Sequence, residues 1–333
     1  MNILVGDIGG TKTILAVFSS QTGVEKCLVE MNFLSNHYDS LEDIIKEFLA
    51  KVELPVDRAC FCVAGPVVNC RSQITNLKWV VDALVIQSKF NLSTVTLLND
   101  LEAMAYAIPI LKAEDIFTLN VGEPIAGGSI AVLAPGTGLG EGFLTCKNGQ
   151  YSAHASEGSH VSFAPVGALQ MGLLTFMNQQ GFDHVSFERV CSGGLGIPYL
   201  YAYLKNKGIT AEPKWIADQL MNCEDPSPVI FNAAQDPARK CELATATLDL
   251  FVAILGAEAG NLALKVLSTG GIYLGGGIPP RILKELQKPA FLEALQSKGR
   301  FRTLLTNMPV HVILNPKPGL LGAAAHGFAS PLS

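Results

Sequence analysis

Short apolar runs alternate with amphipathic segments along the first third of the chain. Apolar or β-branched runs of strand length occupy five segments: residues 3–6, 14–18, 26–33, 59–63 and 95–98. Between or after them, apolar side chains recur three and four positions apart in three segments, at residues 40–49, 82–90 and 101–108, a spacing that predicts helices. The resulting order is three strands, helix, strand, helix, strand, helix. Alternating strands and helices predict an α/β fold with a sheet covered on both faces.

The pattern restarts after a polar stretch at residues 112–115, which is a plausible domain boundary. An apolar run at 128–134 enters a glycine turn and returns at 141–146, as residues 3–18 do near the N-terminus. The arrangement of strand, turn and strand therefore occurs twice, which predicts an internal duplication. Later segments are a mainly helical insertion, a long helix, a strand with a triple-glycine turn, and a final strand and helix, at residues 151–263, 243–267, 271–280, 310–314 and 319–328. Prolines 279 and 280 are expected in the first turn of the helix after the triple glycine.

Glycine turns are candidate phosphate sites. Their backbone amides can approach a polyanion closely. The residues predicted to bind phosphate in these two turns are Gly6, Asp7, Ile8, Gly9, Gly10, Thr11, Lys12, Gly136, Thr137 and Gly138. The alternative is an ordinary hairpin turn, the commonest meaning of Gly-Gly between apolar runs. Neither turn is a P-loop or a dinucleotide fingerprint. Asp7 disfavours the plain turn, because a carboxylate ending a buried strand is costly unless paired, hydrogen-bonded or near a cation such as hydrated Mg²⁺.

Asp100 lies where the run at 95–98 ends and a helix begins. We expect it at the helix N-cap, a position that Asp favours because its side chain accepts free amide hydrogens. Ligands of open α/β sheets also bind beyond the carboxyl ends of the strands, so Asp100 is equally placed to act as a base. The stretch itself leaves both interpretations open.

Polar residues within the insertion are weaker candidates. Glu157, His160 and Glu188 are separated in sequence, and a lone residue of these types usually belongs to a solvated face or a satisfied core. Gly275, Gly276 and Gly277 form a turn on which a flat ligand can lie.

Composition excludes several classes of protein. The chain has 333 residues, is 49% hydrophobic and 16% charged, and carries a net charge of −5, so we expect a well-packed protein of about two domains that does not bind nucleic acid. Neither the N-terminal residues nor the charge-free stretch at 158–182 resembles a secretory signal or a membrane span. Eight cysteines without a Cys-x-x-Cys pair indicate reduced thiols in a cytosol, with Cys60 and Cys62 buried on one strand face rather than ligating metal.

Six segments together resemble the bacterial glucokinase family. They are Asp7-Ile8-Gly9-Gly10-Thr11, Leu98-Asn99-Asp100, Gly136-Thr137-Gly138-Leu139-Gly140, Glu157-Gly158-Ser159-His160, Glu188-Arg189-Val190 and Gly275-Gly276-Gly277-Ile278. The likeness extends over nearly the whole chain, to residues 315–322. It implies duplicated ribonuclease-H-like domains of the actin, hexokinase and heat-shock ATPase superfamily. Residues 1–110, completed by a C-terminal helix at 317–333, would form a small α/β domain, and residues 111–316 a large domain with the sugar-binding insertion.

The resemblance also implies an activity and its residues. The chain would transfer phosphate from ATP to the glucose 6-hydroxyl, the first step of glycolysis, with Asp100 as general base. Sugar hydroxyls would be bound by Thr75, Asn76, Asn99, Asp100, Glu157, His160 and Glu188. The two phosphate turns and Gly275 to Gly277 would bind ATP, and Asp7 would hold Mg²⁺ through water. Lys12 stands where many bacterial glucokinases have a neutral residue.

Partners and alternatives follow from the same resemblance. We expect glucose and ATP as ligands, no nucleic acid or membrane partner, a cytoplasmic location and a homodimer. The alternatives are a kinase of another hexose or amino sugar and a sugar-sensing repressor, which would carry a DNA-binding helix pair ahead of the first strand. Related sugar kinases with a zinc-binding cysteine cluster match poorly, because no such cluster adjoins His160.

Overall fold

The structure is a computed structural model that describes residues 1–74 and 77–329. The chain divides into two compact units, and each is described by itself. Unit 1 comprises Met1–Lys112, Tyr151–Ala155 and Asn315–Ser333, and unit 2 comprises Ala113–Gln150 and Ser156–Leu314.

Unit 1 contains a five-stranded sheet in the order β3-β2-β1-β4-β7. Its strands are β1 (Asn2–Ile8), β2 (Lys12–Ser19), β3 (Gly23–Leu34), β4 (Arg58–Val63) and β7 (Val95–Asn99). Strand β2 is antiparallel to both β1 and β3, whereas β4 runs parallel to β1 and β7 runs parallel to β4. A small hairpin of β5 (Arg71–Gln73) and β6 (Val80–Asp82), which the apolar pattern does not predict, lies outside this sheet.

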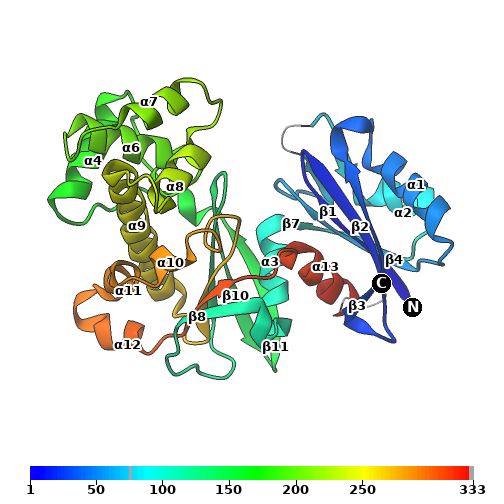
Figure 1. Ribbon diagram of the computed structural model, residues 1–333. Helices are drawn as coiled ribbons and strands as arrows, with labels where there is room; N and C mark the ends of the chain where they lie inside the picture. The colour runs from blue at the N-terminus through cyan, green and yellow to red at the C-terminus, as the bar shows by residue number, and fades with distance from the viewer. Residues whose placement is uncertain (75–76, 330–333) are drawn as a thin grey trace. The chain divides into compact units, whose positions relative to one another are not determined.

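Helices cover both faces of this sheet (Figure 1). Alternate strand residues point to opposite faces, so Leu4 packs with α1 (Leu41–Val52) and α2 (Ala83–Phe90), while Ile3 packs with α3 (Asp100–Ala107) and α13 (Pro318–Ala329). Cys60 and Cys62 are buried on the α13 face, as expected. Among the described residues no group of three or more His, Cys, Asp or Glu side chains is placed to hold a metal.

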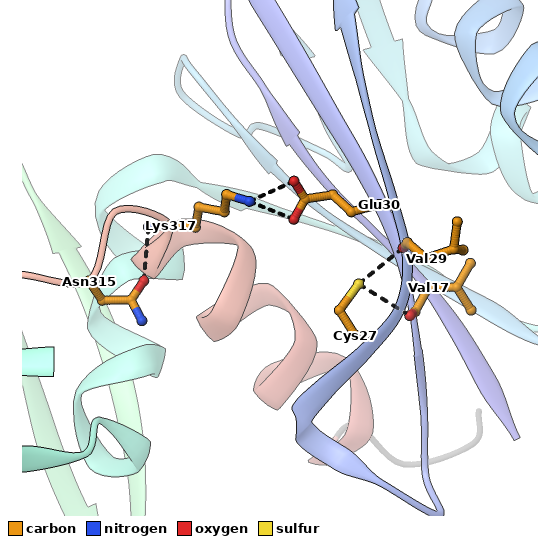
Figure 2. A network of polar contacts seen from close by, with 6 residues as sticks. All are labelled: Val17, Cys27, Val29, Glu30, Asn315 and Lys317. Atoms are coloured by element: carbon orange, nitrogen blue, oxygen red, sulfur yellow. Dashed lines mark hydrogen bonds and ion pairs between the residues drawn. The ribbon is translucent and has the colours of Figure 1, made fainter. Parts of the chain in front are cut away.

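Polar contacts attach the start of α13 to the sheet of unit 1 (Figure 2). The Lys317 ammonium donates to both carboxylate oxygens of Glu30 on β3, at 2.6 and 2.7 Å, and the Lys317 amide donates to Asn315 Oδ1 at 2.9 Å. Nearby on β3, the Cys27 thiol donates to the carbonyl of Val29. The last helix of the chain is thus fixed to a sheet built from the first residues.

Unit 2 supplies five strands of a six-stranded sheet in the order β11-β10-β9-β12-β13-β8, and most residues of the edge strand β11 are grouped with unit 1. Its strands are β8 (Ile116–Asn120), β9 (Ile130–Pro135), β10 (Leu139–Lys147), β11 (Gln150–Ser156), β12 (Gly271–Leu274) and β13 (Val310–Ile313). As with β1, β9 pairs antiparallel to the strand that follows its turn and parallel to a later strand. The strand order of unit 1 is therefore repeated, with β8 added at the edge, and the predicted duplication is confirmed.

The helices of unit 2 surround α9. They are α4 (Gly167–Gln179), α5 (Phe187–Val190), α6 (Gly196–Asn206), α7 (Lys214–Met221), α8 (Pro226–Gln235), α9 (Glu242–Val266), α10 (Leu283–Leu286), α11 (Pro289–Gln296) and α12 (Arg302–Thr306). By length and composition α9 resembles a membrane span, but most of it is buried in the core of the unit, and it is the one helix of this kind in the described chain. The helix after the triple glycine begins at Leu283, so placing Pro279 and Pro280 in its first turn was wrong; both lie in turns that precede it.

Candidate active site

In unit 1, three parallel strands end at the same edge of the sheet. The register aligns Asp7 of β1 with Cys62 of β4 and Leu98 of β7, and one position later Ile8 with Val63 and Asn99. Asp100 begins α3 directly after this row. Asp7 and Asp100 therefore belong to the edge where open α/β sheets bind ligands.

Asp100 is not the helix cap that the sequence suggested. The N-cap is Asn99, whose Oδ1 accepts the amide of Leu101 at 3.0 Å and whose Nδ2 donates to the Gly65 carbonyl at 3.1 Å. The expectation was wrong because the chain already adopts helical geometry at Asp100, the first residue of α3. Asn99 satisfies the helix end and leaves Asp100 exposed at the start of the helix.

The surroundings of Asp100 alter its acidity. Burial of its carboxyl against the protein raises its pKa above the ordinary value, and hydrogen bonds from Leu101 and Asn99 oppose this effect. A carboxylate whose pKa is raised towards neutrality is a better proton acceptor than an ordinary aspartate. The geometry and the electrostatics therefore favour a base at this position.

The carboxylate of Asp7 is half-buried and accepts a weak hydrogen bond from a thiol. Burial is the largest effect and raises the pKa of Asp7. The hydrogen bond from the Cys62 thiol and the charge of Lys12 lower this pKa, whereas the charge of Asp100 raises it. A carboxylate that has lost water and gained only a thiol is suited to a cation. Since no larger cluster of potential metal ligands occurs among the described residues, a cation here would keep most of its water, as Mg²⁺ commonly does.

The turn between β1 and β2 is held by backbone contacts. The Gly9 amide donates to the Lys12 carbonyl at 3.0 Å, and Ser35 donates from its hydroxyl to the Gly9 carbonyl at 2.8 Å. A side chain on Gly9 would lie 3.0 Å from the Lys12 carbonyl oxygen. Close approach thus explains Gly9, and neither Gly9 nor Gly10 has a positive φ.

Other predicted residues of this turn differ in what they can present to a ligand. A side chain on Gly6 would lie 2.7 Å from Phe61, and Ile8 is fully buried in the core. Thr11 and Lys12 are exposed at the turn. Gly6 and Ile8 therefore offer a ligand only their backbone, while Thr11 and Lys12 also offer side chains.

In unit 2, three glycine segments meet at the turn between β9 and β10. The amides of Gly193 and Gly194 donate to the carbonyls of Gly136 and Thr137, at 2.8 and 3.0 Å. The Ile278 amide also donates to the Pro135 carbonyl, at 3.2 Å. Gly276 has φ 79° and lies so close to this carbonyl that a Cβ on Gly276 would be 2.6 Å from its oxygen. The predicted residues Gly136 to Gly138 and Gly275 to Gly277 are thereby brought together.

A cavity of about 220 Å³ opens between these segments. Gly136, Thr137 and Gly277 line it together with residues that were not predicted as site residues: Gly193, Gly194, Asp225, Ser227, Pro228, Phe231, Ile278 and Arg281. Its wall combines glycine backbone, an aromatic ring and one charge of each sign. Of these unpredicted residues, only the glycine pair Gly193-Gly194 could have been recognised in the sequence as a possible backbone site. The others lie in or next to α8 or follow β12, and they reach the cavity only in the folded chain.

The predicted sugar residues of unit 2 lie on two linked segments. Glu157 precedes the short 3-10 helix η4 (Gly158–His160), and His160 Nε2 lies 3.7 Å from Glu157 Oε2 with both side chains exposed. The Phe187 amide at the start of α5 donates to Val161 at 3.2 Å. Strand-like pairing of the two segments therefore connects η4 to the helix that carries Glu188.

Glu188 also lies beside the turn after β9. Its Oε1 is 3.5 Å from the position that a Cβ would take on Gly138. Unit 2 thus joins candidate sugar and phosphate residues in one region. Thr75 and Asn76 lie outside the described residues.

These groups suit the transfer of a phosphoryl group. Such transfer requires amides for the phosphate oxygens and a carboxylate for the attacking hydroxyl, with little covalent chemistry from the protein. Sugar hydroxyls both donate and accept hydrogen bonds, which Glu157, His160 and Glu188 can match.

Comparison with known proteins agrees with this chemistry. A protein-family model described as Glucokinase matches residues 4–329. A glucokinase from Trichormus variabilis is 39% identical over 97% of both chains. A crystal structure of a glucokinase from an Antarctic psychrotroph superposes with a TM-score of 0.84 at 32% identity, covering 99% of each chain. A glucokinase of the ROK family from Streptomyces griseus, solved with glucose and AMPPNP, shares the fold at a TM-score of 0.63 and 21% identity, over 99% of this chain and 100% of that one.

Proposed function

The chain belongs to the glucokinase family and phosphorylates glucose with ATP, and we propose that Asp100 is the general base that takes the proton from the sugar 6-hydroxyl. The observation that supports this role is the position of Asp100. Asp100 begins α3 at the carboxyl edge of a parallel sheet, where part of its surface is open to solvent, while Asn99 is the N-cap of the helix. Partial loss of solvent around its carboxyl raises its pKa above the ordinary value.

We assign sugar binding to Asn99, Asp100, Glu157, His160 and Glu188, the residues that the family resemblance implies. The support is chemical, since carboxylates and an imidazole match hydroxyls, and geometric, since η4 and α5 are hydrogen-bonded neighbours. Thr75 and Asn76 keep their proposed role from the family resemblance alone.

We assign ATP to the glycine turns. The proposed residues are those of the turn from Gly6 to Lys12, the turn from Gly136 to Gly138, and Gly275 to Gly277. To these we add Phe231 and Arg281, because they line the same cavity as Gly136 and Gly277, which has room for a flat ring system at one end of a nucleotide.

Mg²⁺ is proposed as the cofactor at Asp7, through water. Bound there, the ion would neutralise charge on the phosphates of ATP. Asp7 supplies a half-buried carboxylate for it, the Cys62 thiol keeps that carboxylate in place, and Lys12 adds a positive charge nearby. A cytoplasmic location, a place at the start of glycolysis and a homodimeric state are further proposals that rest on the family.

The substitution Asp100→Asn tests the base. It keeps the shape of the side chain and leaves the Asn99 cap intact, so the fold should be unaffected while turnover falls roughly 10²- to 10⁴-fold. Turnover should be followed by ADP release with glucose, mannose, fructose, galactose and N-acetylglucosamine, and folding by thermal unfolding. Turnover within a few-fold of the parent would remove Asp100 as the base, and a preferred sugar other than glucose would change the substrate but not the mechanism.

A further inference from the structure

Two glutamates in the core of unit 2 take no part in the proposed reaction. Glu141 on β10 and Glu258 on α9 both have 0% exposed surface. Within the described residues, neither carboxylate oxygen of Glu141 has a hydrogen-bond donor, and Glu258 Oε1 also has none. An ionised, buried carboxylate without donors would cost several kcal/mol, so this pair must be stabilised in another way.

A shared proton resolves this problem. When one carboxyl is neutral, its hydroxyl can donate to the other, which satisfies an oxygen on each side chain. Burial raises the pKa of Glu141 to about 8, and the charge of Glu258 adds to this effect while Lys265 opposes it. Glu141 is therefore the neutral member of the pair at neutral pH.

Glu258 is the better site for the negative charge. Its Oε2 accepts from the Asn261 side chain at 2.8 Å, and Lys265 Nζ lies 3.5 Å from its Oε1. Lys298 donates to Asn261 Oδ1 at 2.6 Å and adds a second positive charge. All these groups contact Glu258 or its partners, whereas Lys265 acts on Glu141 only as a nearby charge.

The neutral Glu141 lies directly against the predicted sugar turn. A Cβ on Gly158, the first residue of η4, would lie 2.7 Å from Glu141 Oε2. Only glycine fits between this carboxyl and the turn, and Glu157 and His160 flank it on either side. The buried thiol of Cys191 is electrostatically coupled to both glutamates and directly follows α5, which carries Glu188.

We propose that Glu141, kept neutral by its contact with Glu258, is a positioning residue that supports the η4 turn and so aligns Glu157 and His160 with the sugar. The inference rests on the proposed assignment of those two residues to glucose. Glu141 itself does not reach the substrate, since it has no exposed surface.

The protonation of Glu141 gives the turn a pH dependence. At neutral pH Glu141 is protonated, and the charge of the pair is held on Glu258, which Asn261, Lys265 and Lys298 face. As the pH rises through about 8, a second buried negative charge forms next to Gly158 and close to that of Glu258. The support for the turn is therefore present at neutral pH and is lost as the pH rises through about 8.

Glu141→Gln and Glu141→Ala test the proposal in the full-length enzyme. Glutamine keeps the shape and an amide donor for Glu258 but cannot ionise, so at pH 7 its KM for glucose should stay within about threefold of the parent. Alanine leaves a void under Gly158 and should raise the KM for glucose by roughly 10- to 100-fold, with the KM for ATP unchanged. From pH 7 to 9 the KM for glucose of the parent should rise, and that of Glu141→Gln should not.

Several outcomes would overturn the proposal. A folded Glu141→Ala enzyme with the parental KM for glucose is one, and a parent whose pH profile matches that of Glu141→Gln is another. The second comparison needs only the isosteric variant and so remains decisive if the alanine variant does not fold. Glu157→Gln, measured in the same assay, separates the positioning role of Glu141 from the sugar-binding role of Glu157. If Glu157→Gln raises the KM for glucose and Glu141→Ala does not, only the positioning role fails. If Glu157→Gln has the parental KM for glucose, both the sugar assignment and the inference fail.

Discussion

At the scale of single residues, five acidic side chains with similar chemistry have different surroundings. Asp7 and Asp100 have pKa values raised by burial, Glu141 is fully buried, and Glu157 is exposed over 86% of its side chain. Glu188 is half-buried beside Gly138. Burial raises the pKa of Asp7, Asp100 and Glu141 because it disfavours the charged form of each carboxyl.

The raised pKa of Asp100 predicts an acidic limb in the pH profile. A general base works only when ionised, so activity should be gained as the pH rises through the pKa of Asp100, which lies above the ordinary value of 3.8. The profile of kcat/KM for glucose measures this in the free enzyme. Asp100→Asn should retain no such limb; a limb of unchanged position in that variant would assign the titration to another group, such as Asp7.

Glu157→Gln and Glu188→Gln should weaken glucose use selectively. Each change exchanges a charged acceptor for a neutral amide of the same shape, which should cost about 1 to 3 kcal/mol in kcat/KM for glucose. The KM for ATP should change little for Glu157→Gln, because the phosphates are assigned to the glycine turns and not to this carboxylate. Glu293→Gln, on the exposed surface of α11, is the matched control, and two variants as silent as this control would exclude both glutamates from the sugar site.

At the scale of elements, the glycine turns of unit 2 differ in why they need glycine. Gly276 has φ 79° and approaches Pro135 closely, so the fold requires it. Gly136 has nothing within 4 Å of a built Cβ and lines the cavity. The fold therefore tolerates a side chain at Gly136, and only a ligand would exclude one.

This difference predicts opposite effects of the same substitution. Gly136→Ala should leave thermal stability unchanged and raise the KM for ATP about 10- to 100-fold, because the methyl group takes space from the nucleotide. Gly276→Ala should destabilise the protein by about 1 to 2 kcal/mol through its positive φ alone. Thermal unfolding and ATP titration separate them; a parental KM for ATP in Gly136→Ala would place the nucleotide elsewhere.

At the scale of the whole molecule, unit 1 is built from both ends of the chain. Helix α13 packs against α3, β1 and β4, and covers the sheet face that carries Cys60 and Cys62. Its start lies near Asp7, since a Cβ on Gly319 would lie 3.0 Å from Cys62 Sγ and 3.9 Å from Asp7 Oδ2. The fold of the first hundred residues thus depends on the last helix.

Gly322→Ala tests this dependence. A Cβ at this position would lie 1.7 Å from the Ala103 carbonyl oxygen, so α13 and α3 must separate, at a cost of about 3 kcal/mol or more. The free energy of unfolding from denaturant titration measures the effect. Ala329→Ser, an exposed substitution at the end of the same helix, should stay within about 0.5 kcal/mol of the parent; an equally mild Gly322→Ala would show that α13 is not needed for the stability of unit 1.

The sequence by itself determined the strands, the duplication and the residues of the turns, because local apolar period and glycine chemistry depend on neighbours along the chain. The helix predicted at residues 40–49 is α1, and Ser40 caps it by accepting the Asp43 amide at 3.3 Å. The sequence pattern missed the hairpin of β5 and β6 and the edge strand β8, which are short or only partly apolar, and it wrongly placed the residues of strand β11 at the start of the mainly helical insertion.

Only the tertiary structure decided how distant residues combine. It made Asn99 rather than Asp100 the cap, brought Asp225, Phe231 and Arg281 to one cavity with Gly136, and paired Glu141 with Glu258 across the core. The physical reason is that burial and nearby charges set the acidity of each group. Both of these depend on contacts between segments that can lie more than a hundred residues apart in the chain.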